Sequence, residues 1–352
     1  MRVGILTFHE IYNPGAFFQA YATMKAVQNL GHDAQIIDYT SPLHRFRPWR
    51  NLLLHPKILL SPRSWIESFQ KNNAFSRCQK YLNKTVRIKT RKDLSREHFD
   101  VILIGSDIVW NYQDKRLGRD PVYFGHYLST KRLAAYAPSC GAIDLSKPIP
   151  DFVKSGLSKF HEIAVRDHKT ADLVELVIGK RPEIITDPTL NLDTYSFPDF
   201  PVYDSDYFLV YAMSNSLSQD ITSKIINFAH SHNLRVISVC YRQNWVDDNL
   251  ISCNPFEWLA RIRDARYFFT NTFHGTVFAI KENKSFAASF NNLTATKIHS
   301  FLKMINMEDR IVTDFENFED IISSPLSNCH LQMDLASFAS CNLDYLRKCI
   351  VK

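Results

Sequence analysis

The sequence lacks the features that mark membrane, secreted and zinc-binding proteins. None of its apolar runs approaches the roughly 18 residues that a membrane-spanning helix needs. The seven cysteines are scattered, with no CxxC pair, which favours reduced thiols over a disulfide framework or a zinc site. The apolar stretch after Met1 is too short for a signal peptide, because His9 and Glu10 follow it at once. These absences predict a cytoplasmic protein.

Several cofactor and catalytic motifs are also missing. The chain has no GxGxxG or Walker loop, so it does not resemble a dinucleotide-binding protein or a P-loop NTPase. A Ser-His-Asp hydrolase would need a nucleophile elbow, which is absent. No cluster of side chains has metal-ligand spacing, and no sequence repeat has a fixed period. We therefore expect no bound metal.

What the chain does contain is the composition of a globular protein. Hydrophobic residues make up 45% of the sequence and charged residues 22%, which excludes an intrinsically disordered chain. A length of 352 residues is sufficient for two domains of ordinary size.

Charge is distributed unevenly along the chain. Segment 41–92 contains thirteen Lys or Arg residues and one acid, Glu67, so it carries +12 while the whole chain carries +6. Aromatic and aliphatic side chains, including Phe46, Trp49 and Trp65, alternate with these charges. This mixture is typical of a segment at an anionic membrane surface. A solvated helical insertion that packs on its domain is the alternative. A nucleic-acid partner is not expected, because no nucleic-acid motif accompanies the charges.

Short apolar runs alternate with amphipathic stretches in two β-α-β series. The first series predicts strands at 3–7, 35–38, 101–105, 131–137 and 162–165, with helices at 17–30 and 171–178. The second predicts strands at 207–212, 235–240, 267–269 and 285–289, with helices at 218–233, 255–263 and 297–305. We therefore expect an α/β protein with domains at 1–195 and 205–330. The first domain carries the insertion 41–92, and a C-terminal helix at 331–352 packs back on that domain. Ligands of such sheets bind beyond the carboxyl ends of the strands.

Two motifs with polar or glycine residues follow expected strands of the first domain. In Asn13-Pro14-Gly15-Ala16, the glycine lets the backbone approach a ligand closely. The second motif runs from Gly105 to Asn111. Its Ser106 and Asp107 could bind sugar hydroxyls or serve as acid or base, and Trp110 could stack on a sugar ring. A helix cap made by Ser106 or Asp107 is the alternative.

Arg166 directly follows another expected apolar strand of the same domain. A guanidinium held there suits bidentate binding of a carboxylate or phosphate. An ion pair with Asp167 or Asp187 is an equally good interpretation. We interpret the segment from Thr186 to Thr189 as a structural Asx turn.

The stretch from Tyr267 to Ile280 is the most informative part of the sequence. It reads as a buried strand that runs into a helix, with His274 at the turn. A helix N-terminus presents N–H groups and the positive end of the helix dipole, both of which favour an anion. His274 could bind such an anion and transfer a proton. The alternative is a core histidine that seals the junction.

In their order and spacing, these motifs together resemble the polysaccharide pyruvyl transferase family. The similarity extends from Gly4 to Arg310. The blocks that carry it are Gly4–Phe8, Asn13–Ala16, Gln19–Ala22, Leu30–Asp33, Ile36–Tyr39, Gly105–Asp107, Val109–Asn111, Tyr136–Ala137 with Ser139, Val165–Asp167, Asp187–Leu190 and Asn271–Phe278 with Lys284 and Phe286.

The resemblance implies two Rossmann-like domains that face a central cleft, in a GT-B-like arrangement. It implies transfer of a pyruvyl group from phosphoenolpyruvate onto a sugar, with formation of a cyclic ketal and release of phosphate. The sugar would belong to a polysaccharide, such as a capsule or exopolysaccharide, or to a lipid-linked precursor. No metal or organic cofactor is expected. A lipid-linked acceptor would place the enzyme at the inner face of the cell membrane.

The resemblance also implies roles for individual residues. His274 and Asp107 would be catalytic. The donor would be bound by Arg166, Thr272, Asn271 and Gly275, and the acceptor by Gly15, Ser106, Trp110 and Asn111. Thr272 departs from the pattern of some distant members, which carry an arginine before this histidine. Arg242, Lys297 and Arg310 are candidates for a replacement cation.

Two other functions fit the same architecture. One is a glycosyltransferase that uses a nucleotide sugar, although no convincing nucleotide-binding pair is found in the second domain. The other is a non-catalytic carbohydrate-binding protein. The presence of Asp107, Arg166 and His274 favours an enzyme.

Overall fold

The computed structural model of the chain describes residues 1–39, 62–114, 119–194, 197, 201–290, 295–312 and 315–351. The chain divides into two compact units. Unit 1 comprises Met1–Trp65, Gln79–Leu192 and Ala336–Lys352, and unit 2 comprises Ile66–Cys78 and Asp193–Leu335. The sequence placed the boundary between 195 and 205, close to this one.

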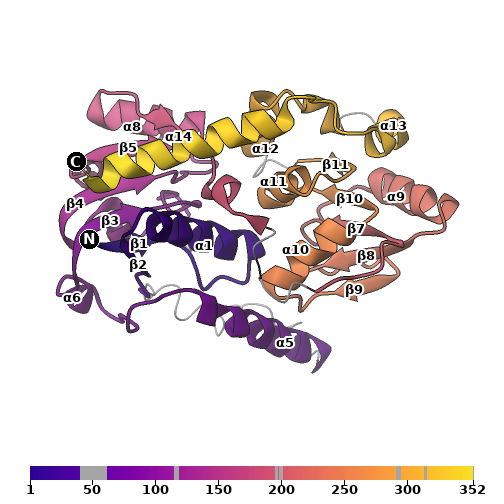
Figure 1. Cartoon of the computed structure of the whole chain (residues 1–352), viewed down its shortest axis with the longest axis horizontal. Helices are drawn as coiled ribbons and strands as arrows, with labels where there is room; N and C mark the ends of the chain where they lie inside the picture. The colour runs from indigo at the N-terminus through magenta and orange to yellow at the C-terminus, as the bar shows by residue number, and fades with distance from the viewer. Residues whose placement is uncertain are drawn as a thin grey trace. The chain divides into compact units, whose positions relative to one another are not determined.

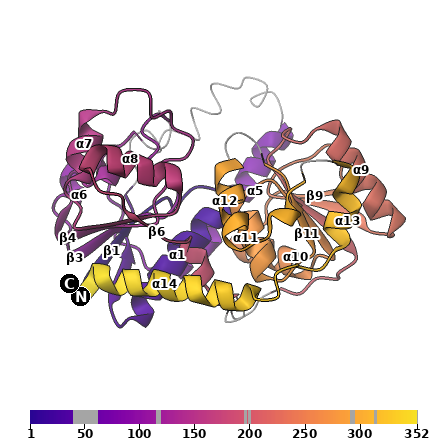
Figure 2. The ribbon, with the colours of Figure 1, turned by 90° about the horizontal axis from the view of Figure 1, so that it is seen from above.

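Unit 1 contains a six-stranded sheet, visible edge-on in Figure 2. Its strands are β1 (Arg2–Leu6), β2 (Asp33–Ile36), β3 (His98–Ile104), β4 (Ser129–Tyr136), β5 (Glu162–Val165) and β6 (Glu183–Ile184). They lie in the order β2-β1-β3-β4-β5-β6, and every neighbouring pair is parallel. The central strands are apolar almost without interruption, because helices cover both faces of the sheet.

The helices of unit 1 include α1 (Pro14–Asn29), α6 (Arg91–Leu94), α7 (Asp151–Leu157), α8 (His168–Ile178) and, from Ala336 on, α14 (Leu331–Val351), with short 3₁₀ turns η1 (Gln79–Tyr81), η2 (Pro121–Phe124) and η3 (Pro188–Asn191). Figure 2 shows α7 and α8 on one face of the sheet and α1 and α14 on the other. The Tyr345 hydroxyl of α14 donates to the Ala135 carbonyl (3.0 Å), and its ring stacks on Tyr136. The C-terminal helix therefore packs on the sheet of unit 1.

Unit 2 contains a five-stranded sheet, labelled in Figure 1. Its strands are β7 (Tyr207–Tyr211), β8 (Arg235–Val239), β9 (Asp248–Leu250), β10 (Tyr267–Thr270) and β11 (Phe286–Ala288). Their order is β11-β10-β7-β8-β9, and all neighbouring pairs are parallel.

Helices cover both faces of the second sheet. The described helices of unit 2 are α5 (Pro62–Cys78, of which residues 62–65 belong to unit 1), α9 (Gln219–Ser231), α10 (Pro255–Asp264), α11 (Phe273–Lys281), α12 (Ala295–Met304) and α13 (Phe318–Ser323), with 3₁₀ turns η5 (Glu308–Arg310) and η6 (Phe315–Asn317). Successive side chains of β7 point to opposite faces. Phe208 packs in a cluster with Phe228 of α9, whereas Tyr211 contacts Trp258 of α10. Both faces of the strand are therefore buried.

The structure confirms the predicted α/β class with two Rossmann-like domains and corrects one assignment. The insertion 41–92 was assigned whole to the first domain, but Ile66–Cys78 belongs to unit 2. The reason is a long-range ion pair between Glu67 of α5 and Arg242, together with burial of Phe75 and Cys78. Residues 40–61 lie outside the described part of the chain. Among the described helices, none combines the length and the apolar character that crossing a bilayer requires.

Candidate functional site

The first candidate site lies at the carboxyl ends of β1 and β3 in unit 1, where Gln19 joins two loops. The Gln19 Nε2 donates to the Thr7 hydroxyl (2.8 Å), and its Oε1 accepts from the Ser106 backbone N–H (3.1 Å). Gly15 lies in the first turn of α1, where its N–H donates to the Asn13 side chain (2.9 Å). The predicted acceptor residues Gly15 and Ser106 therefore belong to one edge of one sheet.

Asp107 and Arg166 meet at this edge. The Arg166 Nη2 lies 3.6 Å from Asp107 Oδ1, and its Nη1 lies 2.5 Å from Asp187 Oδ2 and 3.4 Å from Ser106 Oγ. The Arg166 and Asp187 side chains are almost fully buried, whereas that of Asp107 is 13% exposed. Asp107 is thus the member of this cluster that solvent or a substrate can reach.

The ion pair between Arg166 and Asp187 changes the interpretation of Arg166. One guanidinium facing two carboxylates leaves a net negative charge in these described contacts. A negative cluster disfavours a highly anionic donor such as phosphoenolpyruvate. The alternative given by the sequence, pairing with Asp187, is what the structure shows, so we now assign Arg166 to holding Asp107. Asp187 also caps η3 through the Thr189 N–H (3.0 Å), in agreement with the predicted Asx turn.

Trp110 does not have the predicted sugar-stacking role. Its indole is fully buried between the rings of Phe124 and Phe160, and its Nε1 donates to the Tyr123 carbonyl (2.7 Å). A ring enclosed by its own core cannot offer a face to a ligand, so the prediction is wrong. Asn111 is half-buried, and its Oδ1 accepts from the Asp114 N–H (3.0 Å) in the same loop.

The second candidate site lies at the carboxyl end of β10 in unit 2. His274 occupies the first turn of α11 and is 8% exposed. Thr272 caps this helix, because its hydroxyl accepts from the Gly275 N–H (3.1 Å). The Asn271 side chain bonds to the Met213 N–H (3.0 Å) and the Ser216 hydroxyl (2.7 Å), which ties the β7 loop to the turn. The predicted strand-turn-helix at His274 is therefore present.

Gly275 is required for packing within the turn. A Cβ at this position would lie 2.2 Å from the Thr270 Oγ1 and 2.6 Å from the Thr272 Oγ1. Its N–H is already engaged by the helix cap. The predicted donor-binding roles of Thr272, Asn271 and Gly275 are better described as building the turn that holds His274.

The three cations proposed to stand in for a missing arginine lie in different environments. Arg310 is buried and donates to the carbonyls of Ile321, Ser324 and Pro325 (2.8–3.0 Å), so it is a structural clamp. Lys297 is buried on α12. Arg242 follows β8 at the carboxyl edge, is 32% exposed and pairs with Glu67. Arg242 is the candidate that a ligand can reach.

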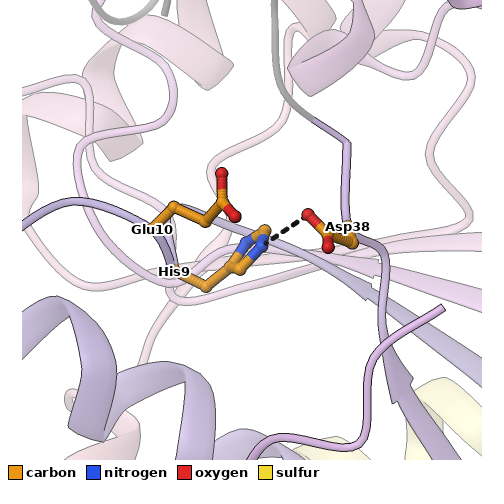
Figure 3. Close-up of side chains that lie close together, drawn as sticks. All are labelled: His9, Glu10 and Asp38. Atoms are coloured by element: carbon orange, nitrogen blue, oxygen red, sulfur yellow. Dashed lines mark hydrogen bonds and ion pairs between the residues drawn. The ribbon is translucent and has the colours of Figure 1, made fainter. Parts of the chain in front are cut away.

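Sequence reasoning missed a cluster formed by His9, Glu10 and Asp38, shown in Figure 3. The ring nitrogens of His9 contact the Thr7 carbonyl (3.1 Å) and Asp38 Oδ1 (3.3 Å). His9 and Asp38 are buried. The sequence contained a signal for this cluster, because its residues directly follow strands β1 and β2. These strands are parallel neighbours, so their carboxyl ends lie side by side.

One imidazole and two carboxylates at this spacing have the donor set of a divalent metal site. Two cations already occupy its surroundings: Lys84 lies 3.7 Å from Asp38, and Arg87 pairs with both Glu10 and Asp38. The positive charges of Lys84 and Arg87 compensate the negative charges of Glu10 and Asp38, so these side chains form a salt-bridge network. These residues therefore fit a metal poorly.

Substitution of Asp38 by asparagine tests this network through its pH dependence. Burial alone raises the pKa of Asp38, but the hydrogen bond and charge of His9, with the charge of Lys84, outweigh it and lower the pKa. Such a carboxyl stabilises the fold above its unfolded pKa of about 4 and loses that contribution as pH falls through the folded pKa. We expect the variant to be about 2 kcal/mol less stable at pH 7, as for loss of a hydrogen bond to a charged group, with the difference shrinking below pH 4. Urea unfolding at pH 7 and below pH 4 measures this difference in the free energy of unfolding.

The exposed Asp33→Asn serves as a matched control and should leave stability unchanged at both pH values. A stability difference for Asp38→Asn that is the same at both pH values would contradict the assigned ion pairing.

Comparisons with known proteins bear on family and fold. The sequence profile of the family described as polysaccharide pyruvyl transferase matches residues 13–292, well over half of the chain. No curated protein gives a significant match.

Similar solved structures include UDP-GlcNAc 2-epimerase from Methanocaldococcus jannaschii, with 10% identity, 94% of each chain covered and a TM-score of 0.51. MnaA of S. aureus with UDP has 11% identity, covers 99% of this chain and 96% of its own, and has a TM-score of 0.51. UGT89C1 of Arabidopsis thaliana with UDP-L-rhamnose has 12% identity, 99% of each chain covered and a TM-score of 0.50. At such low identity the likeness shows the fold alone, which is GT-B-like.

Proposed function

Because the chain belongs to the polysaccharide pyruvyl transferase family, we propose that it transfers the pyruvyl group of phosphoenolpyruvate onto a sugar as a cyclic ketal. The observation that carries this proposal is His274. It is a nearly buried imidazole in the first turn of a helix, at the carboxyl edge of a parallel sheet. That position combines a proton donor with the positive end of a helix dipole.

The reaction needs an acid at the donor. Protonation of the methylene carbon of phosphoenolpyruvate generates positive charge at C2, and a sugar hydroxyl then forms a bond to C2 and loses its proton. A second hydroxyl displaces phosphate, which leaves with the electron pair of the C2–O bond and takes up the second proton. We assign the first proton to His274, with donor phosphate or carboxylate held by the start of α11 and by Arg242.

The acceptor needs a base and hydrogen-bonding groups. We assign the base to Asp107, which is the partly exposed carboxylate of its cluster and is held by the buried Arg166. Ser106 and Gly15 are buried at the same edge, so they build the backbone around Asp107, and the half-buried Asn111 lies in the loop that follows Asp107. The partly exposed Asp107 carboxylate suits a neutral, hydroxyl-rich sugar better than an anion. Unit 1 is therefore proposed to bind the acceptor and unit 2 the donor.

The proposal is tested by comparing phosphoenolpyruvate with UDP-sugars as stabilising ligands and as substrates. We expect phosphoenolpyruvate to raise Tm, since a ligand that binds only the folded state stabilises it. With a lipid-linked or polysaccharide sugar, we expect phosphate release and a product that is heavier by one pyruvyl group. Stabilisation by the UDP-sugar alone, with glycosyl transfer, would show a nucleotide-sugar glycosyltransferase. Stabilisation by a sugar without turnover of either donor would show a carbohydrate-binding protein.

A further inference from the structure

Helix α5 is attached to unit 2 by one of its faces. Glu67 pairs with Arg242, and the side chains of Phe75 and Cys78 are buried. Lys71 is half-buried, and burial lowers its pKa. These four α5 positions recur at intervals of three or four residues, so they form one stripe along the helix.

The opposite side of α5 is apolar at its N-terminal end. Trp65, Ile66 and Phe69 are 46%, 57% and 73% exposed. Their spacing of three and four residues places them together, away from the stripe that holds the helix. Ile66 and Phe69, both more than half exposed, lie outside the stripe that attaches the helix, and such exposed apolar side chains favour a docking function over a structural one.

Charge identifies the kind of partner. The segment 41–92, which contains α5, carries thirteen basic residues and one acid. Apolar side chains including tryptophan, within a strongly basic segment, match the interface of an anionic bilayer. A second copy of the chain is a poor partner, because docking two such segments would bring like charges together.

We propose that the outer face of α5 docks on an anionic lipid bilayer, with Ile66 and Phe69 entering the headgroup region. This inference goes beyond the proposed reaction and does not depend on it. It also predicts that the docking face and the proposed donor cation are linked, because the Glu67 that pairs with Arg242 lies on the same helix.

Vesicle flotation with the full chain tests the proposal. We expect binding to phosphatidylcholine vesicles that contain phosphatidylglycerol, weak binding to phosphatidylcholine alone, and loss of binding at high salt. The double variant Ile66→Ser with Phe69→Ser should bind anionic vesicles at least about tenfold more weakly. Leu176→Ser, which replaces another exposed apolar side chain (63% exposed, on α8), is the matched control and should bind normally.

Other occupants of the face give different results, and each overturns the proposal. If segment 40–61 covers α5, the double variant will have a lower Tm and faster proteolysis within 40–61. If a second copy covers it, the wild type will be a dimer and the double variant a monomer. Absence of vesicle binding, or binding that the double variant leaves unchanged, also overturns it. An assay with a soluble acceptor tests the proposed reaction separately, because a soluble acceptor can be reached without membrane docking. Failure to bind vesicles can therefore be distinguished from failure of the reaction.

Discussion

Replacement of His274 by asparagine is expected to lower kcat for phosphoenolpyruvate-dependent ketal formation by about 10³-fold, within the range measured for loss of a general acid. Asparagine is polar and of similar size, so the first turn of α11 should persist. The expected signature is a large fall in kcat with a small change in KM, because protonation of the methylene carbon occurs in the transition state. Phosphate release and product mass provide the measurement.

The matched controls alter the turn around His274 without removing the imidazole. Thr272→Ser keeps a hydroxyl that can cap α11, and it should retain most of the activity. Thr272→Val removes the cap and should cost about 1 kcal/mol of stability. If His274→Asn lowers Tm as much as Thr272→Val does but leaves kcat within about threefold, the histidine only seals the strand-helix junction and the catalytic assignment fails.

Replacement of Gly275 by alanine is expected to destabilise unit 2 by about 3 kcal/mol, at the upper end of the range for overpacking. The new Cβ would lie 2.2 Å from the Thr270 Oγ1 and 2.9 Å from the Thr270 Cβ. Neither threonine can move freely, since Thr270 donates to the Tyr211 carbonyl (2.8 Å) and Thr272 caps α11. Urea unfolding measures the loss.

A double-mutant cycle separates this clash from a general effect of alanine. Thr270→Ala removes the hydroxyl that the new methyl group meets, so Gly275→Ala should cost about 1 kcal/mol less in that background. Equal costs in both backgrounds would contradict the packing role of Gly275 and return it to the predicted donor-binding role.

Local patterns in the sequence were sufficient for most of the fold. Apolar runs such as Val101–Ile104 predict buried strands, because a parallel strand is covered on both faces. The capping residue Thr272 ahead of the apolar stretch from Val277 to Ile280 predicts the start of a helix within a few residues. These features depend on neighbours in the chain, so a single sequence reveals them. The ordered blocks that resemble one family are local in the same sense, and the match over residues 13–292 confirms that family.

Side-chain partners could not be predicted in the same way. The sequence predicted that Trp110 stacks on a sugar, whereas its contacts with the rings of Phe124 and Phe160 place it in the core. His9 and Asp38 meet because β1 and β2 are parallel neighbours, which no local spacing shows.

The sequence by itself determined the α/β class, the two β-α-β series, the family and the position of His274 at a strand-helix turn. The tertiary structure decided which charges are available to a ligand. Arg166 lies 21 residues from Asp187 in the chain, and Arg242 lies 175 residues from Glu67. An ion pair depends on distance in space, and only the folded backbone brings such residues together. For that physical reason Arg166 is a buried partner of Asp107 and Asp187, whereas Arg242 is the one of the three candidate replacement cations that a ligand can reach.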